Sequence, residues 1–236
     1  MSAVPSLIAI TLIAVVGMFD LVVYGGFVEG EDAIDVLNPA GTVTAEQARA
    51  RAQTAELDDS SELPGRFVPN QGRQHVDFGE SVEFCAEGEV SDQCYASNPP
   101  TSGLHLPSQR GVTLESGQRL DMPPNPGVYE FAVPRESIPH IQEHAGVYVG
   151  HDCDSEACRE VVAQVEDVVV QELALGARVV MTPDPDLERN TIALASWTRV
   201  DSFGSADYTD PRVRDFIKAH SCRFDPERFC RDRPLN

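Results

Sequence analysis

The sequence predicts an α+β protein: a single layered domain with a mixed or antiparallel sheet, preceded by one N-terminal transmembrane helix. Three observations support this prediction. Residues 4–28 are almost continuously apolar. The six cysteines fall into three close pairs along the chain. In the second half, strand-like and helix-like patterns follow one another as strand, helix, strand, strand, helix, an order typical of helices packed on a mixed sheet.

The apolar N-terminal stretch predicts an uncleaved membrane anchor. Residues 4–28 contain few polar groups, namely Pro5, Ser6, Thr11 and Asp20. The stretch is long enough for a bilayer core of about 30 Å, which takes roughly 20 helical residues. A cleaved signal peptide is the alternative, but the basic start and small-residue cleavage site that it needs are not visible. We therefore expect residues 1–28 to be a transmembrane anchor in the cytoplasmic membrane.

Residues 29–73 are acidic and rich in proline and serine, which predicts a linker. Within them, Thr44 and Gln47 have the spacing of a capping box, so a short helix is expected to run through Ala55. This helix is polar on nearly every side, which favours a solvated spacer or a docking segment. The remaining residues, 74–236, form the predicted disulfide-stapled α+β domain.

The first half of this domain shows short strand patterns around a long loop. Residues 75–78 and 81–84 alternate between apolar and polar, as strands do. Residues 95–125 are rich in proline, glycine and serine and predict a long ordered loop. Residues 127–133 and 146–150 predict two further strands.

The second half contains the clearest helix, at residues 155–175, where apolar side chains recur at helical spacing until Gly176 ends the pattern. Residues 177–181 and 191–200 predict two buried strands. A last helix is expected to begin at Asp210, and one side of it carries Val213, Phe216 and Ile217.

The cysteines predict three local disulfides: Cys85–Cys94, Cys153–Cys158 and Cys222–Cys230. Six cysteines allow 15 connectivities, and only the local one joins neighbours throughout. Such bonds form in oxidising compartments, so we expect the domain on the periplasmic or extracellular side of the membrane. A redox role for the 153/158 pair is the alternative, but the pair lacks the C-x-x-C spacing of thioredoxin-like enzymes.

The formal net charge of −20 argues against nucleic acid as a partner. Binding to nucleic acid needs a basic face that displaces counterions from phosphates. The expected partners are the lipid bilayer and integral membrane protein subunits.

Histidines gather in the segment SIPHIQEHAGVYVGHDC, residues 137–153. His140 and His144 are four residues apart, so a helical turn starting at Pro139 would put both imidazoles on one face, as a shared metal ion requires. His105, at the end of the proline-stiffened segment NPPTSGLH, is the best distant third ligand, with Glu143 and His151 in reserve. The alternative is that these histidines only form hydrogen bonds with the main chain.

His140, Glu143 and His144 also match H-x-x-E-H, the inverted zinc-protease motif, in which the glutamate acts as general base. That chemistry needs a long helix as a platform. Here Gly146 and a strand-like segment follow directly. A metallohydrolase is therefore the last of our hypotheses, and we expect no catalytic residues.

Four segments, YASNPPTSGLH, PNPGVYEF, IPHIQEHAGVYV and ALASW, occur in this order and resemble the family called domain of unknown function 3105. The resemblance covers residues 95–225. It implies an anchored or secreted extracytoplasmic protein whose signature polar positions are His105, His140, Glu143 and His144. The chain departs from the family pattern at Leu104, Gln142 and Ala145, where the pattern has proline, leucine and glycine.

The leading functional hypothesis is a membrane-anchored, non-catalytic domain that binds copper or zinc. The ligands would be His105, His140 and His144, with Glu143 as a further ligand or as a group that orients one. The alternative is an accessory subunit of a larger membrane protein complex, docked by its single helix and its acidic linker. Asp20 within the apolar stretch would then meet a polar partner.

Overall fold

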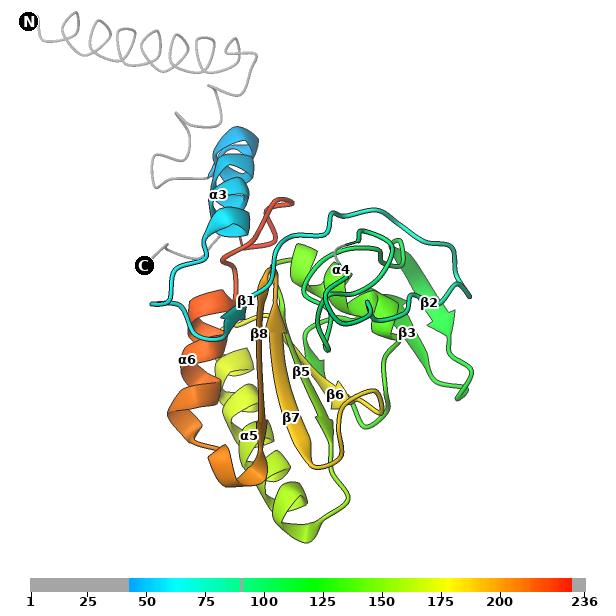
Figure 1. The fold of residues 1–236 in the computed structure, drawn as a ribbon, viewed down its shortest axis with the longest axis vertical. Helices are drawn as coiled ribbons and strands as arrows, with labels where there is room; N and C mark the ends of the chain where they lie inside the picture. Colours follow the sequence, from blue (N-terminus) through cyan, green and yellow to red (C-terminus); the bar gives the residue numbers. More distant parts are fainter. Residues whose placement is uncertain (1–42, 90, 231–236) are drawn as a thin grey trace, which may run out of the picture. The chain divides into compact units, whose positions relative to one another are not determined.

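The structure is a computed structural model that describes residues 43–89 and 91–230 (Figure 1). Over these ranges, no helix combines the length and the apolar character needed to cross a membrane. The predicted anchor, residues 1–28, lies outside the described part of the chain, so it stays a prediction.

The domain is built on a six-stranded mixed sheet with the strand order β1-β8-β7-β5-β6-β4. The pairs β5–β6 and β6–β4 are parallel, and the other pairs are antiparallel. The mixed sheet and the α+β class are therefore as predicted. The strands are β1 (Arg66–Phe67), β4 (Gly127–Val128), β5 (Val147–Asp152), β6 (Val179–Pro183), β7 (Thr191–Ser196) and β8 (Arg199–Gly204).

Two helices, α5 (Glu156–Ala174) and α6 (Asp210–His220), lie side by side on one face of the sheet (Figure 1). Both bounds of α5 were predicted to within one residue, and the start of α6 was predicted at Asp210, as observed. Each has a polar N-cap, since the side chains of Ser155 and Thr209 accept hydrogen bonds from the main chain of the first turn. Their apolar faces close a core with alternate residues of β5, among them Val147 and Val149.

The opposite face of the sheet is covered by a second apolar cluster. It joins Tyr148 of β5 to helix α4 (Ile138–Glu143) and to the hairpin of β2 (Gln109–Thr113) and β3 (Arg119–Met122). A short 3₁₀ helix, η1 (Arg135–Ser137), precedes α4, and a second, η2 (Ser205–Asp207), precedes α6. Because α4 carries two of the candidate ligands, this face is where the site lies.

Helix α3 (Ala45–Leu57) begins with the predicted capping box at Thr44. The helix is packed on the domain, which differs from the solvated spacer that was one of the two alternatives its polar sequence predicted, the other being a docking segment. Ala48, Ala52 and Ala55 are buried, and the last two contact Trp197. Alanines at positions i, i+4 and i+7 form a narrow apolar face that an overall count of polar residues misses.

Three strand predictions were wrong in extent. Residues 75–78 and 81–84 contribute only isolated bridges, at His75 and Phe84. Residues 127–133 form a strand only at β4. The expected loop at residues 95–125 instead contains the β2–β3 hairpin.

Residues 191–200 are two strands, β7 and β8, and not the single strand predicted. The chain reverses at Trp197 and Thr198, and Thr198 has a φ of 62°. A left-handed residue at a turn is usually glycine or asparagine. A threonine there gives no turn signal in the sequence, which is why the reversal was missed.

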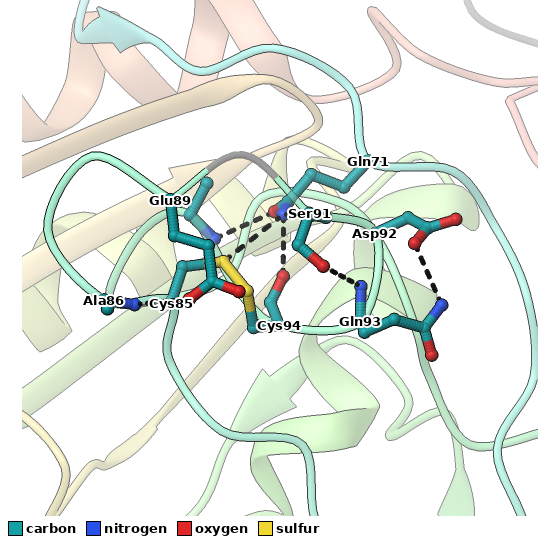
Figure 2. Close-up of a disulfide and its surroundings, with 9 residues drawn as sticks. Gln71, Cys85, Ala86, Glu89, Ser91, Asp92, Gln93 and Cys94 are labelled. Carbon is teal, nitrogen blue, oxygen red and sulfur yellow. Dashed lines mark hydrogen bonds between the residues drawn. A yellow bond between two sulfur atoms is a disulfide. The ribbon is translucent and has the colours of Figure 1, made fainter.

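All three local disulfides are present and no cysteine is free. Figure 2 shows the Cys85–Cys94 loop, which is filled by the amide of Gln71. This amide donates to the carbonyl oxygens of Ser91 at 2.6 Å and Cys94 at 2.7 Å, and its oxygen accepts from the Ala96 amide at 2.9 Å. The disulfide loop is thus tied to the segment that leads toward the site.

Candidate metal centre

His105 lies at the end of a loop that is fastened to the rest of the domain. The Gln142 side chain of α4 donates to the carbonyl oxygen of Pro100 at 2.8 Å, and the Tyr95 hydroxyl donates to that of Leu104 at 2.6 Å. The His105 side chain is completely buried. The proline-stiffened loop therefore folds back against α4, as the ligand hypothesis requires.

Helix α4 presents His140 and His144 on one side, as their spacing predicted. The helix has one and a half turns, and His144 is its C-cap residue. The Nε2 atoms of the two imidazoles are 3.1 Å apart. His140 is buried, while His144 is partly exposed.

The main chain sets the tautomers of the two buried imidazoles. His105 Nδ1 is 2.9 Å from the carbonyl oxygen of Gly103, and His140 Nδ1 is 2.6 Å from that of Leu106. A carbonyl oxygen only accepts, so both Nδ1 atoms carry the hydrogen. In the neutral rings, Nε2 is then left with its lone pair, which is the arrangement found in metal-binding histidines.

These lone pairs converge on a carboxylate. His105 Nε2 is 3.1 Å from Glu143 Oε2, and one ligand atom each from His105, His140 and Glu143 lie within 4.8 Å of one another. Two ligands of a tetrahedral zinc ion with bonds of about 2.05 Å are about 3.3 Å apart. The spacing of the three groups suits a single metal ion.

The charge states also suit a metal. Burial lowers the pKa of His140 to about 4. For Glu143, burial alone would raise the pKa, but the neighbouring His105 and Arg73 hold it below its ordinary value. Burial and the proximity of His140 lower the pKa of His144 to about 3. At neutral pH His140 and His144 are neutral and the Glu143 carboxylate is ionised, which are the forms that bind metal.

The structure adds three polar neighbours that the sequence analysis did not find. Arg73 Nη1 is 3.4 Å from Glu143 Oε1. The His75 ring lies edge-on to that of His105, with centroids 4.9 Å apart. Glu227 Oε2 is 3.2 Å from His144 Nε2. All three come from segments distant in sequence, and no spacing pattern connects them to the motif.

His151, the reserve ligand, is not part of this group. It lies near the end of β5, paired with Pro183 of β6 and Ile192 of β7. The ligand group of the described residues contains His105, His140 and Glu143. His144 is not a member of this group, and its contact with the group is the one between its Nε2 and His140 Nε2.

A second group of possible ligand atoms lies at Cys85, Glu89 and Cys94. Both sulfur atoms are joined in a disulfide, so neither is available as a thiolate (Figure 2). The Glu89 carboxylate instead accepts a hydrogen bond from the Ala86 amide at 2.9 Å. This group is structural.

Comparison with known proteins identifies the region that holds the site. A family model described as "Protein of unknown function (DUF3105)" matches residues 87–232. No significant match was found among curated proteins or among solved structures. The matched region contains His105, α4 and Glu227, but not Arg73 or His75.

Proposed function

The chain belongs to the DUF3105 family of proteins of unknown function, and we propose that its domain binds a transition-metal ion without catalysing a reaction. His105, His140 and Glu143 supply three ligand atoms. His144 lies outside this group, but its Nε2 is 3.1 Å from that of His140, and we propose that it joins as the fourth ligand when the ion binds. Three imidazoles and one carboxylate suit zinc or copper and not magnesium or calcium, which prefer oxygen ligands.

The observation that carries this proposal is the contact between His105 and Glu143. Because His105 Nδ1 donates to the main chain, the ring in its neutral form turns the Nε2 lone pair toward Glu143 Oε2, 3.1 Å away inside the protein. Two facing lone pairs repel unless a proton or a metal ion lies between them. Although the two atoms are close, His105 Nε2 makes no regular hydrogen bond with any described residue. A metal ion bound between the two atoms would satisfy both lone pairs.

A closed set of ligands argues against catalysis. Four protein ligands fill a tetrahedral ion, whereas a catalytic zinc keeps one position for water. The Glu143 carboxylate faces His105 on one oxygen and Arg73 on the other. It is thus held as a ligand and is not free to act as the base of a metallohydrolase.

We further propose that the domain lies outside the cytoplasm, attached to the membrane by residues 1–28. The three disulfides support an oxidising compartment. The alternative of an accessory subunit in a membrane complex now rests on residues 1–42 alone, since residues 44–73 of the expected linker include α3 and β1, which pack on the domain.

Metal analysis of the purified chain tests the proposal. Full-length protein should contain about one zinc or copper ion per chain, and His140→Asn and His105→Asn should lose it. His151→Asn is the control, because His151 is a partly buried histidine of the same domain that lies outside the ligand group. Full metal content in both site variants, with intact disulfides and an unchanged circular dichroism spectrum, would reject the site.

A further inference from the structure

Exposure to solvent rises stepwise from the buried ligands toward the surface. The His105 side chain is fully buried, that of His144 is 15% exposed and that of Glu227 is 48% exposed. The steps between them are short: 3.1 Å from His140 Nε2 to His144 Nε2, and 3.2 Å from there to Glu227 Oε2. An exposed carboxylate is thus connected to the buried centre through one imidazole.

The segment that carries Glu227 is held in place next to His144. The disulfide Cys222–Cys230 closes it into a loop, and the Asp225 carboxylate accepts hydrogen bonds from the amides of Phe229 at 2.7 Å and Cys230 at 3.0 Å. The Phe229 ring stacks on His144 with centroids 4.0 Å apart. Glu227 is therefore held at a fixed distance from the imidazole and does not meet it by chance on a mobile tail.

The other approach to the centre is electrostatically unfavourable for a cation. Arg73, which is 46% exposed, lies 3.4 Å from Glu143 Oε1 and presents a positive charge there. Glu227 presents a negative charge on the His144 side. The Arg178 guanidinium also lies on the His144 side, where its Nε donates to the His144 carbonyl oxygen at 2.7 Å, so the exposed Glu227 carboxylate is the group there that attracts a cation.

We propose that Glu227 and His144 form an outer metal site through which a divalent transition-metal cation reaches the buried ligands. This inference rests on the proposed function. The cation first binds the Glu227 carboxylate and His144 Nε2, and His140 Nε2 then replaces Glu227. Glu143 and His105 complete the inner set. Only metal–ligand bonds form and break, and the oxidation state of the ion does not change.

The test measures the rates of zinc uptake and release. Metal-free full-length protein is mixed with Zn²⁺ in a stopped-flow instrument, and loaded protein is mixed with excess chelator. Glu227→Gln should slow both uptake and release by about tenfold, the lower end of typical electrostatic steering. Its equilibrium affinity should stay within about threefold of wild type, because the inner ligands are unchanged.

Two control variants make the outcome decisive. Glu188→Gln removes an equally negative charge from an exposed position and should leave both rates unchanged. His75→Asn tests the opposite approach, since the exposed His75 ring lies beside His105. Uptake slowed in His75→Asn but normal in Glu227→Gln would overturn the proposed route.

Other outcomes separate the two proposals. Faster release and a large loss of affinity in Glu227→Gln would show that Glu227 is a ligand of the resident ion, which also overturns the entry role. If the wild-type chain takes up no zinc and no copper, the metal site itself is rejected. In that case the fault lies with the proposed function and not with the route.

Discussion

Two regions of the domain bury nitrogen-rich side chains, and they use them in opposite ways. In the histidine cluster, defined as His105, His140 and His144, the Nε2 atoms lie close to one another and to carboxylates: His140 Nε2 is 3.1 Å from His144 Nε2, and His105 Nε2 is 3.1 Å from Glu143 Oε2. In the arginine cluster, defined as Arg199, Arg223 and His220, the nitrogens donate outward to the main chain.

The arginine cluster holds the segment between α3 and β1. Arg199 donates to the carbonyl oxygens of Asp58 at 2.7 Å, Ser60 at 2.9 Å and Gly65 at 3.1 Å. Arg223 donates to the carbonyl oxygen of Ala55. His220 Nε2 donates to the carbonyl oxygen of Pro64 at 2.8 Å. Arg199 Nε, Arg223 Nε and His220 Nδ1 have no partner among the described residues, but the bonds to the main chain already fix all three side chains.

The comparison shows how to tell a structural cluster from a ligand site. Burial and residue type are similar in the two clusters. What differs is the neighbour of the nitrogens: a carboxylate and other imidazoles in the histidine cluster, and main-chain carbonyl oxygens in the arginine cluster. A guanidinium has five donors and no acceptor, so it cannot bind a metal cation, whereas an imidazole has one atom of each kind.

The largest expected effect is a loss of stability on breaking the arginine cluster. Arg199→Met should lower the free energy of unfolding by about 3 kcal/mol, because three buried carbonyl oxygens lose their donors. Urea denaturation measures it. Arg66→Met, at an exposed position of β1, should change stability by less than about 0.5 kcal/mol.

The metal content of Arg199→Met should stay that of wild type. A variant that lost both stability and metal would show that the two clusters are coupled, and the contrast drawn between them would fail.

The second effect belongs to the histidine cluster. Free metal at 100 times its dissociation constant should raise the free energy of unfolding by about 2.7 kcal/mol, because it binds only the folded state. Calorimetry with zinc and with a chelator measures the shift. The shift should vanish in His105→Asn and persist in His151→Asn. An equal shift in both would place the bound metal elsewhere.

The third effect is a pH dependence of the free energy of unfolding, which arises from His220 in the arginine cluster. Burial, with the nearby Arg223, lowers the pKa of His220 to about 3 in the folded state. Its stabilising contribution is thus fully present above the unfolded pKa of about 6.5 and is lost as the pH falls toward 3.

His220→Gln should therefore reduce the acid sensitivity. Between pH 6 and pH 4, the stability of wild type should fall more steeply than that of the variant by about 1.4 kcal/mol per pH unit. Denaturation with urea at several pH values gives the two slopes. Parallel curves would mean that His220 is not held neutral in the folded protein.

The smallest effect lies at the edge of the histidine cluster. Ala145 has a φ of 65°, directly after the C-cap residue of α4. A left-handed alanine is strained, although glycine has more freedom to lose on folding. Ala145→Gly should therefore stabilise the protein by about 0.5 kcal/mol and leave metal binding unchanged. Thermal unfolding measures the gain, and a lower melting temperature would contradict it.

Local signals in the sequence were sufficient for several features. The three disulfides followed from cysteines that are neighbours in the chain. Helices α5 and α6 followed from apolar residues at helical spacing with a cap at the start and, for α5, a glycine at the end. The four-residue spacing of His140 and His144 predicted their shared face. Each of these depends on residues within a few positions of one another.

Other features exist only because distant segments meet. The alanines of α3 form a buried face only because the helix packs in one cluster with Trp197. The turn at Thr198 is imposed by the pairing of β7 with β8. Arg73 and Glu227 approach opposite ends of the histidine group from outside its motif. These contacts form through long-range packing, so no pattern among residues close in the sequence predicts them.

The chain therefore encodes locally which side chains are available for a metal, namely His105, His140, His144 and Glu143. The folded domain decides which atoms they offer, because the carbonyl oxygens of Gly103 and Leu106 bind the Nδ1 hydrogens and turn the Nε2 lone pairs inward. The orientation of a main-chain carbonyl depends on the backbone path of the whole loop. Residue identity alone does not specify it.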